Sequence, residues 1–279
     1  MRTRFAPSPT GPLHLGHAYS AILNHDAARA SGGSFVLRIE DIDRSRARPE
    51  WEAAIYEDLR WLGLDWEEPV MRQSDRMPAY AEALDRLWDM GVLYPCDCRR
   101  RDILEALSAP QEGSVTYGPD GPVYPGTCRP GTAPTGPRPT GTALRLDMRR
   151  ALHRIGDAPL SYIESDERIE VSRDALVDAV GDVAIARRDM DTSYHLSVVV
   201  DDAAQGITDV MRGADLADAT QIHVLLQVLL SLPSPRYVHH ELIRDEAGKR
   251  LAKRDDARAI SRYRDDGHTP EDIRAMVNL

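Results

Sequence analysis

The pattern of apolar and polar positions predicts an alternation of short strands and amphipathic helices along the chain. Residues 3–6 and 34–39 are short, largely apolar runs of strand length. Between them, residues 16–30 form a helix candidate that the pair Gly32 and Gly33 closes. The first forty residues therefore predict a strand, a helix and a second strand, which together form a βαβ unit.

The same patterns predict further elements up to the C-terminus. Helices are expected at residues 49–62, 75–90, 192–201, 218–230, 256–264 and 270–276, and strands at residues 143–146, 183–186, 207–211 and 236–240. Strands that alternate with helices favour an α/β fold with a mostly parallel sheet. Ligands of such folds bind at the carboxyl ends of the strands.

Residues 108–141 differ sharply from the rest of the chain. This segment contains eight prolines and seven glycines among 34 residues. Because so many breakers prevent regular structure, we expect an irregular segment that is mobile unless something anchors it.

Composition and charge limit the class of protein. The chain has 279 residues, enough for one or two domains, and lacks an apolar run near the roughly 18 residues that a membrane helix needs. The N-terminus has no apolar signal-peptide core, so we expect a cytoplasmic protein. The net charge of -10 opposes nucleic-acid binding, because phosphate contacts require cations. Local basic runs nevertheless occur at residues 99–101, 149–150, 187–188 and 249–254.

A first candidate for chemistry is the HLGH sequence at residues 14–17, which lies between the first strand and its helix. The N-terminus of a helix presents free N–H groups to phosphate. His14 and His17 can donate hydrogen bonds to phosphate oxygens, and Gly16 lets a nucleotide approach the backbone. The alternative is a turn with two solvated histidines.

A second candidate is the cationic run at residues 248–254, which follows the last predicted strand. It holds Lys249 and Lys253, the only two lysines among 35 basic residues. Lysine is a compact and flexible point charge, unlike the planar arginine fork. Such a loop can neutralise a leaving pyrophosphate, since cations that face developing charge contribute strongly to catalysis. The alternative is an ordinary solvated charge run.

The third candidate uses every cysteine of the chain: Cys96, Cys98 and Cys128. Three cysteines are an odd number, which argues against a disulfide framework. Thiolates at CxC spacing can share one zinc ion, and a third from a distant loop would fasten that loop. Zinc needs a fourth ligand, for which Asp97, a water molecule and a histidine are candidates. Three ordinary reduced cysteines are the alternative.

Eight short strings together resemble the glutamyl branch of the class I aminoacyl-tRNA synthetases. They are RFAPSPTG at residues 4–11, HLGH at 14–17, LRIEDIDR at 37–44, YHL at 194–196, VVDD at 199–202, GITDV at 206–210, RG at 212–213 and RLAKR at 250–254. They span nearly the whole chain in family order. The resemblance implies an α/β fold, with a Rossmann-like catalytic domain, an inserted zinc-bearing subdomain and a short helical C-terminus.

The resemblance also implies roles for single residues. His14, His17 and Lys253 would be catalytic, and ATP would bind His14, Gly16, His17, Arg250, Leu251, Ala252, Lys253 and Arg254. Arg4, Tyr194 and Arg212 would read the side-chain carboxylate of glutamate, for which guanidinium groups are suited. Glu40 would hold the α-ammonium, while Phe5, Ala6, Pro7 and Ser8 would line the same pocket. The alternative for Arg4 and Arg212 is an ion pair with Asp41 or Asp209.

Two departures from the family pattern alter these expectations. In the second ATP motif, usually KMSKS, this chain has Arg250 and Ala252 in place of the first lysine and the serine. We therefore expect slower or altered loop closure with Lys253 retained. Val198 stands where full-length glutamyl-tRNA synthetases commonly carry asparagine, which predicts weaker or differently tuned glutamate binding.

A truncated branch of the family matches this chain in two further ways. Its zinc site resembles the CxC sequence together with Tyr124 and Cys128, which makes Tyr124 a candidate for the fourth ligand. Only 25 residues follow Arg254, so we expect no anticodon-binding domain. The expected parts are residues 1–93 and 181–241 as halves of the catalytic domain, 94–180 as the inserted subdomain, and 242–279 as the ATP loop and helical end.

The resemblance to this branch implies partners and a reaction. The chain would activate L-glutamate with ATP and Mg²⁺, and would transfer it to queuosine in the anticodon of tRNA(Asp), acting as a monomer with one Zn²⁺. Splayed loop bases are the parts of RNA that proteins read most readily. The alternatives are charging of the 3′ end of tRNA(Glu), a small-molecule nucleotidyltransferase, and a non-catalytic RNA-binding protein.

Overall fold

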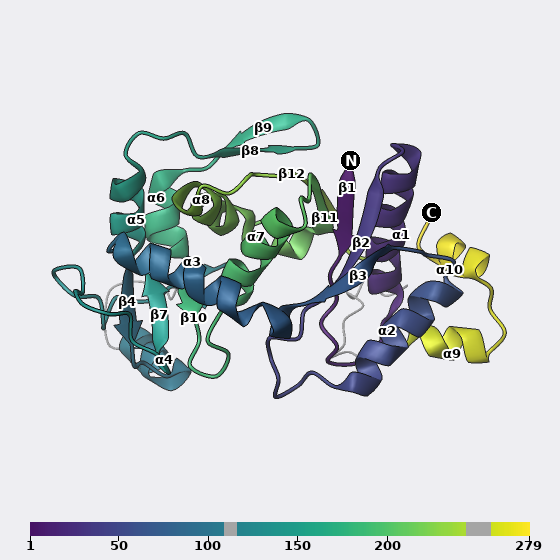
Figure 1. The fold of residues 1–279 in the computed structure, drawn as a ribbon, viewed down its shortest axis with the longest axis horizontal. Coiled ribbons are helices and arrows are strands. Elements are labelled where there is room, and N and C mark those ends of the chain that lie inside the picture. The colour runs from purple at the N-terminus through teal and green to yellow at the C-terminus, as the bar shows by residue number, and fades with distance from the viewer. Residues whose placement is uncertain (109–115, 244–257) are drawn as a thin grey trace. The chain divides into compact units, whose positions relative to one another are not determined.

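The computed structural model describes residues 1–108, 116–243 and 258–279 (Figure 1). The chain divides into two compact units. The first consists of Met1–Asp75, Gly206–Asp215 and Pro235–Leu279, and the second of Arg76–Gln205 and Leu216–Ser234. None of the helices in these ranges is long and apolar enough to cross a membrane.

Parallel strands form the centre of the first unit. The order β1-β2-β3 joins β1 (Arg2–Phe5), β2 (Ser34–Ile39) and β3 (Glu67–Arg72), and both pairings are parallel. A second parallel pair consists of β11 (Asp209–Gly213) and β12 (Arg236–His240). The backbone N–H of Thr208 donates to the carbonyl of Arg2 at 3.0 Å, so the start of β11 lies beside β1. The predicted parallel α/β architecture is confirmed.

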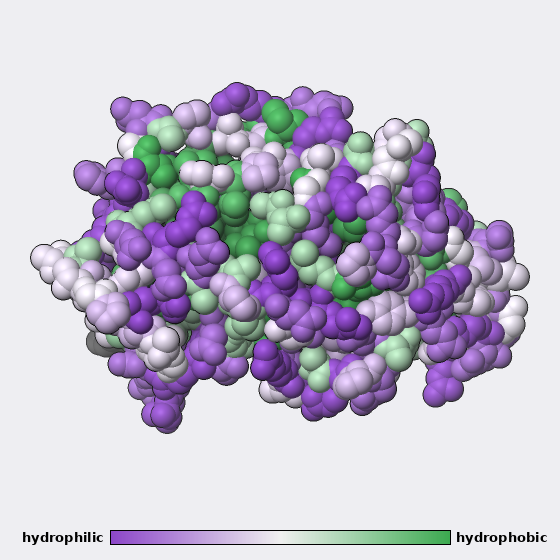
Figure 2. All heavy atoms as spheres, viewed as in Figure 1, coloured by the Kyte–Doolittle hydropathy of each residue, from purple (hydrophilic) through white to green (hydrophobic). Residues whose placement is uncertain are grey.

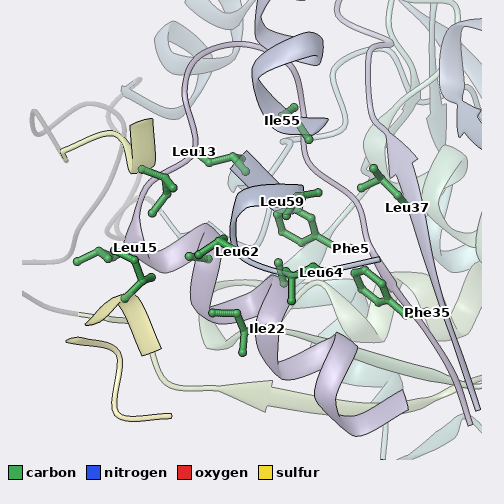
Figure 3. Close-up of a cluster of buried hydrophobic side chains, with 14 of the residues drawn as sticks. Phe5, Leu13, Leu15, Ile22, Phe35, Leu37, Ile55, Leu59, Leu62 and Leu64 are labelled. Carbon is green, nitrogen blue, oxygen red and sulfur yellow. The ribbon is translucent and has the colours of Figure 1, made fainter. Parts of the chain in front are cut away.

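Helices pack around these strands and enclose the core of the first unit. They are α1 (Leu15–Ala30), α2 (Pro49–Trp61), α9 (Ile260–Asp265) and α10 (Pro270–Met276). Apolar side chains from β1, β2, α1 and α2 meet in one buried cluster, in which Phe5, Ile22, Phe35 and Leu59 point toward one another (Figure 3). The apolar faces that the sequence predicts for these helices and strands therefore pack against one another in a single core.

The second unit has an antiparallel sheet and two hairpins. The sheet has the order β10-β7-β4. The strands are β4 (Leu93–Cys96), β7 (Ala143–Leu146), β10 (Ala184–Ala186), and the hairpins β5 (Tyr117–Gly118) with β6 (Gly121–Pro122) and β8 (Ser161–Glu164) with β9 (Glu167–Glu170). Its helices are α3 (Met77–Asp89), α4 (Arg100–Ser108), α5 (Met148–Ile155), α6 (Arg173–Ala175), α7 (Tyr194–Ala204) and α8 (Thr220–Leu230). Apolar side chains remain visible over α7 and α8 in Figure 2.

Short helical turns complete the list of elements: η1 (Gln73–Arg76), η2 (Leu176–Val180) and η3 (Ala214–Leu216). The predicted elements before residue 63 lie within one residue of the observed ones. The apolar pattern of the sequence did not predict β3, β4, α4, α5, α6 or either hairpin.

The described part of the proline-rich segment is irregular, as expected, apart from the β5–β6 hairpin. Side chains from the rest of the second unit hold it in place. The indole N–H of Trp88 donates to the carbonyl of Gly136 at 2.8 Å, and Arg138 forms a 2.6 Å ion pair with Asp85. The described part of the segment therefore has anchors, which is the condition under which we did not expect mobility.

Asp58 of α2 generates a prediction on stability. Its side chain is 2% exposed, and burial raises its pKa to about 6 even though Arg264 lies 3.6 Å away. Between the unfolded pKa near 3.8 and about 6, the folded chain binds more protons than the unfolded chain, so stability falls as pH rises through this range. Asp58→Asn removes this titration. We expect the variant to be more stable than wild type at pH 8, by about 1–2 kcal/mol after screening, and nearly equal at pH 4.

Urea unfolding at both pH values measures this difference. Asp65→Asn is the matched control, because hydrogen bonds from His25 and Arg29 lower the pKa of Asp65 to about 2. The ionised form of Asp65 therefore stabilises the fold above pH 4, and its loss should act in the opposite direction. An Asp58→Asn variant that is less stable than wild type at pH 8 would mean that the contact with Arg264 outweighs the burial cost.

Candidate functional site

The two histidines of the HLGH sequence form the start of α1. His14 is the N-cap, and its Nδ1 accepts a hydrogen bond from the backbone of Gly16 at 3.2 Å. The backbone N–H of His14 donates in turn to Nδ1 of His17 at 3.2 Å. Since Nδ1 accepts in both rings, the neutral histidines carry their hydrogen on Nε2. Two Nε2–H donors therefore belong to the N-terminus of one helix.

This arrangement suits an anionic oxygen ligand. His14 is buried, His17 is partly buried, and the two ring centroids are 3.8 Å apart. Both rings take part in the capping box of the helix. A Cβ atom at Gly16 would lie 3.1 Å from Cε1 of His14, closer than side chains normally pack. The glycine therefore allows the imidazole to fold back onto the helix start. Helix N–H groups and ring N–H groups together can bind phosphate.

A cavity of about 840 Å³ lies in the same unit. Its wall combines Tyr19 of α1 with the residues that follow β11 and β12 and with the end of α10. The lining residues are Tyr19, Ala214, Asp215, Glu241, Leu242, Ile243, Met276, Val277 and Asn278. A volume of this size is typical of sites for small organic ligands. The second ATP motif, with Arg250, Leu251, Ala252, Lys253 and Arg254, lies outside the described residues.

Polar side chains of the first unit gather at the carboxyl ends of its strands. Arg4 of β1 and Arg212 of β11 are both buried, with 5% and 6% exposure. Glu40 directly follows β2 and accepts a 3.2 Å hydrogen bond from the fully buried Arg38. Because the carboxyl ends of parallel strands share one edge of a sheet, these charged groups belong to the same edge.

The loop after β1 follows the same edge. Its residues Ala6, Pro7 and Ser8 lead from Phe5 towards α1, and the backbone N–H of Glu40 donates to the carbonyl of Pro7 at 3.0 Å. Asp41, one of two alternative partners for the arginines, accepts from the backbone of Ser74. The other, Asp209, forms a 2.7 Å ion pair with Arg236.

Tyr194 belongs to the second unit, where it begins α7. Ser193 caps this helix through a 3.4 Å hydrogen bond from the backbone N–H of Leu196. The rings of His195 and His223 lie 5.5 Å and 5.6 Å from the Tyr194 ring. Val198 follows one turn later and is 2% exposed, so the position where the family pattern has asparagine is apolar and buried here.

The three cysteines meet in the second unit, although Cys128 lies 30 residues after Cys98 in the chain. Cys96 ends β4, and its Sγ and those of Cys98 and Cys128 all lie within 4.8 Å of one another. No disulfide joins them. The hydroxyl of Tyr124 lies 3.5 Å from Cys96 Sγ and 3.4 Å from Cys98 Sγ. One tyrosine oxygen and three sulfurs therefore surround a common centre.

The geometry and chemistry of these donors fit a zinc-sized ion. Tetrahedral Zn–S bonds of about 2.3 Å place two sulfurs roughly 3.8 Å apart, and the Cys98 and Cys128 sulfurs are 3.5 Å apart. Asp97, an alternative fourth ligand, is largely exposed and pairs with Arg188 at 2.9 Å. Among the described residues, the Tyr124 hydroxyl is thus better placed than the Asp97 carboxylate to complete the set.

The members of the cluster change one another's pKa values through their hydrogen bonds. Burial and hydrogen bonds to the thiols raise the pKa of Tyr124 well above its usual range. Burial also raises the pKa of Cys98. Burial alone would raise the pKa of Cys128 too, but hydrogen bonds from the Tyr124 hydroxyl and the Asp97 backbone hold it at about 7. Cys128 therefore ionises more readily than Cys98, and metal binding requires thiolates.

Comparison with known proteins places this geometry in a family context. The chain matches the class I tRNA synthetases for glutamate and glutamine, catalytic domain, over residues 1–132 and 144–279. A Rhodobacter capsulatus protein named Glutamyl-Q tRNA(Asp) synthetase is 60% identical over 280 residues, covering 100% of both chains. A protein of that name from Symbiobacterium thermophilum is 41% identical, over 97% of this chain and 83% of its own.

A solved structure extends the comparison to the fold. The crystal structure of a glutamate tRNA ligase from Elizabethkingia meningosepticum, in complex with its amino acid, aligns with a TM-score of 0.74 and 26% identity. The alignment covers 97% of this chain and 59% of the ligase chain. The residues that align with these relatives therefore extend over both units described above.

Loss of one thiol tests the metal site. We expect wild type to bind one Co²⁺ ion with the intense visible absorption of tetrahedral thiolate coordination, and Cys128→Ser to lose most of this absorption, since a serine oxygen is a poor substitute for a thiolate. Optical titration with Co²⁺ measures both. Ser172→Ala, which changes a helix cap of the same unit, should leave the spectrum unchanged. An unaltered spectrum in Cys128→Ser would exclude this cysteine as a ligand.

Proposed function

The chain belongs to the class I tRNA synthetases for glutamate and glutamine, and from this premise we propose that it attaches L-glutamate to queuosine in the anticodon of tRNA(Asp). The observation that carries the proposal is the 60% identity, over the full length of both chains, to the Rhodobacter protein named Glutamyl-Q tRNA(Asp) synthetase. The HLGH helix start and the buried arginines support it, because they supply partners for phosphate and for a carboxylate substrate. The reaction would take place in the cytoplasm, where tRNAs are used.

The first step activates glutamate. Its α-carboxylate attacks the α-phosphorus of ATP, a carboxylate–phosphorus bond forms, and the bond to pyrophosphate breaks. The Nε2–H groups of His14 and His17 would donate to phosphate oxygens, and the cavity beside Tyr19 would receive the adenosine. Mg²⁺ bound with ATP would reduce the negative charge of the phosphates. Lys253 and its neighbours in the second motif would neutralise the leaving pyrophosphate.

Glutamate would be recognised by charge. Arg4 and Arg212 of the first unit would bind the side-chain carboxylate, and Glu40 would bind the α-ammonium. Buried guanidinium groups suit a carboxylate but meet the NH₂ donors of glutamine unfavourably, so glutamine would be rejected. Arg38 supports this assignment, because its hydrogen bond orients the Glu40 carboxylate at the strand end. The apolar Val198 leaves one polar contact fewer than the family pattern.

The second step transfers glutamate to the RNA. A hydroxyl of queuosine attacks the carbonyl carbon of the adenylate, an ester bond forms, and AMP leaves as the anhydride bond breaks. The hydroxyl proton passes to solvent. In this proposal the acceptor is an anticodon base, which stands in an unpaired loop and can enter a protein pocket.

Zinc would have a structural role. We assign Cys96, Cys98, Cys128 and Tyr124 as ligands of one Zn²⁺, on the strength of their donor chemistry and spacing. The ion would join the end of β4 to residues 124–128 of the proline-rich segment. This assignment also supports the notion of residues 94–180 as an inserted zinc-bearing part of the catalytic domain.

Labelled glutamate tests the transfer reaction. We expect purified protein with ATP and Mg²⁺ to label bulk tRNA that contains queuosine and to leave tRNA from queuosine-deficient cells unlabelled, because the acceptor hydroxyl is then missing. Precipitable radioactivity measures both. Equal labelling of the two pools would indicate 3′-end charging, and the absence of label in both would favour a non-catalytic protein. Amino-acid-independent pyrophosphate exchange would favour a small-molecule nucleotidyltransferase.

Gly16→Ala tests the helix start. The added methyl group meets His14 at 3.1 Å and should displace its ring. We therefore expect the KM for ATP to rise about 10-fold or more in glutamate-dependent pyrophosphate exchange, as for a lost hydrogen bond to a charged group. The KM for glutamate should change much less. Gly131→Ala is the control, because nothing lies within 4 Å of its added Cβ. Unchanged ATP kinetics in Gly16→Ala would mean that His14 does not bind the nucleotide.

A further inference from the structure

Arg145 contacts two members of the cysteine and tyrosine cluster at once. Its Nε–H donates to Cys96 Sγ at 3.2 Å. The centre of its guanidinium lies 3.8 Å from the centroid of the Tyr124 ring, well within the range of a cation–π contact. Neither the spacing of the cysteines nor the family strings singled out this residue.

Strand register explains how Arg145 reaches the cluster. In the antiparallel pairing of β4 with β7, Arg145 stands opposite Tyr94, and Cys96 stands opposite Ala143. Because side chains two residues apart share a face of a sheet, Arg145 and Cys96 lie on the same face as diagonal neighbours. A diagonal separation of about 7–8 Å between backbones is spanned by a side chain as long as arginine.

A third contact fixes the orientation of the guanidinium. Nη1 of Arg145 donates to the backbone carbonyl of Asp182 at 2.8 Å. The Asp182 carboxylate is engaged elsewhere, with Arg129 at 2.6 Å and with the Tyr94 hydroxyl at 2.5 Å. The positive charge of Arg145 is thus directed at the sulfur and the aromatic ring, while Arg129 pairs with the buried Asp182 carboxylate.

The guanidinium of Arg145 offsets part of the negative charge of the proposed metal site. Three thiolates and one phenolate around Zn²⁺ carry a net charge of −2, and burial of uncompensated charge is costly. The guanidinium of Arg145 reduces the local charge to −1 and donates a hydrogen bond to one of the thiolates. Groups that hydrogen-bond to metal ligands orient them and typically change metal affinity 10- to 100-fold.

We propose that Arg145 is a positioning residue of the metal site, which strengthens zinc binding and holds Tyr124 as the fourth donor in preference to water. The proposal rests on the zinc assignment made above and needs neither glutamate nor tRNA. Arg145 fixes the plane of the Tyr124 ring from one face and the Cys96 sulfur from the side. The arginine thereby makes an uncommon oxygen ligand effective in this site.

Zinc affinity of arginine variants tests the proposal. Competition between the intact protein and a chromophoric chelator gives the Kd for Zn²⁺. We expect Arg145→Met, which keeps the length and loses the charge, to raise this Kd at least 10-fold. Arg145→Lys keeps the charge without the planar fork and should lie between this variant and wild type. Arg173→Met is the matched control, because within the described part of the chain Arg173 bonds to the Leu152 and Ala158 carbonyls and not to the cluster. Its Kd should stay within about twofold of wild type, as for an independent site.

A double-variant cycle with Tyr124→Phe tests the role of the tyrosine. If Arg145 acts through the phenol, the effects of Arg145→Met and Tyr124→Phe on the Zn²⁺ Kd are less than additive, and the Co²⁺ spectra of both single variants shift in the same direction. Wild-type affinity in Arg145→Met, with Arg145→Lys also unchanged, would overturn the proposal. A wild-type chain that binds no Zn²⁺ would overturn it together with the zinc assignment, while glutamate transfer to tRNA, measured separately, would still decide the proposed function.

Discussion

The parallel pairing of β1 with β2 is the constraint on which the candidate site depends. It brings both chain exits to one edge, where the Glu40 N–H donates to the Pro7 carbonyl and ties the two exits together. That edge carries Arg4, Glu40 and the start of α1. The parallel partner pair of β11 and β12 continues beside β1 and adds Arg212. A slip of one residue in this pairing would turn the charged side chains to the other face.

The sequence predicted the βαβ start well because its apolar periods there are long and cleanly bounded. The pair Gly32 and Gly33 precedes the strand at 34–39, and Pro49 stands at the start of the helix that follows it, so both elements have clear boundary signals. By contrast β3 is Glu67–Arg72, a polar and mostly exposed strand without alternation. The β8–β9 hairpin is similarly charged, and its turn uses positive φ at Ser165 and Asp166 rather than glycine. Pairing partners create such strands, and a local pattern does not contain them.

The candidate site likewise contains residues that could be predicted from the sequence and residues that could not. His14, Gly16 and His17 stand close together in the sequence, so spacing alone identified them, and the three cysteines formed the cluster that their chemistry suggested. Tyr124 was named through resemblance, since a lone tyrosine carries no local signal. Arg145 and the cavity wall at residues 276–278 were missed, because their relevance arises only from strand register and from the packing of the last helix.

The discontinuous first unit has a consequence for the synthesis of the chain. Its strands come from residues 2–72 and again from residues 209–240, with the long stretch Arg76–Gln205 between them. While the ribosome makes that stretch, the edge of β1 that later meets β11 has no partner from its own chain. An unpaired strand edge is a template for aggregation, and domains form as their segments emerge. The nascent protein must therefore keep an open edge shielded for about 7–26 s, at synthesis rates of roughly 5–20 residues per second.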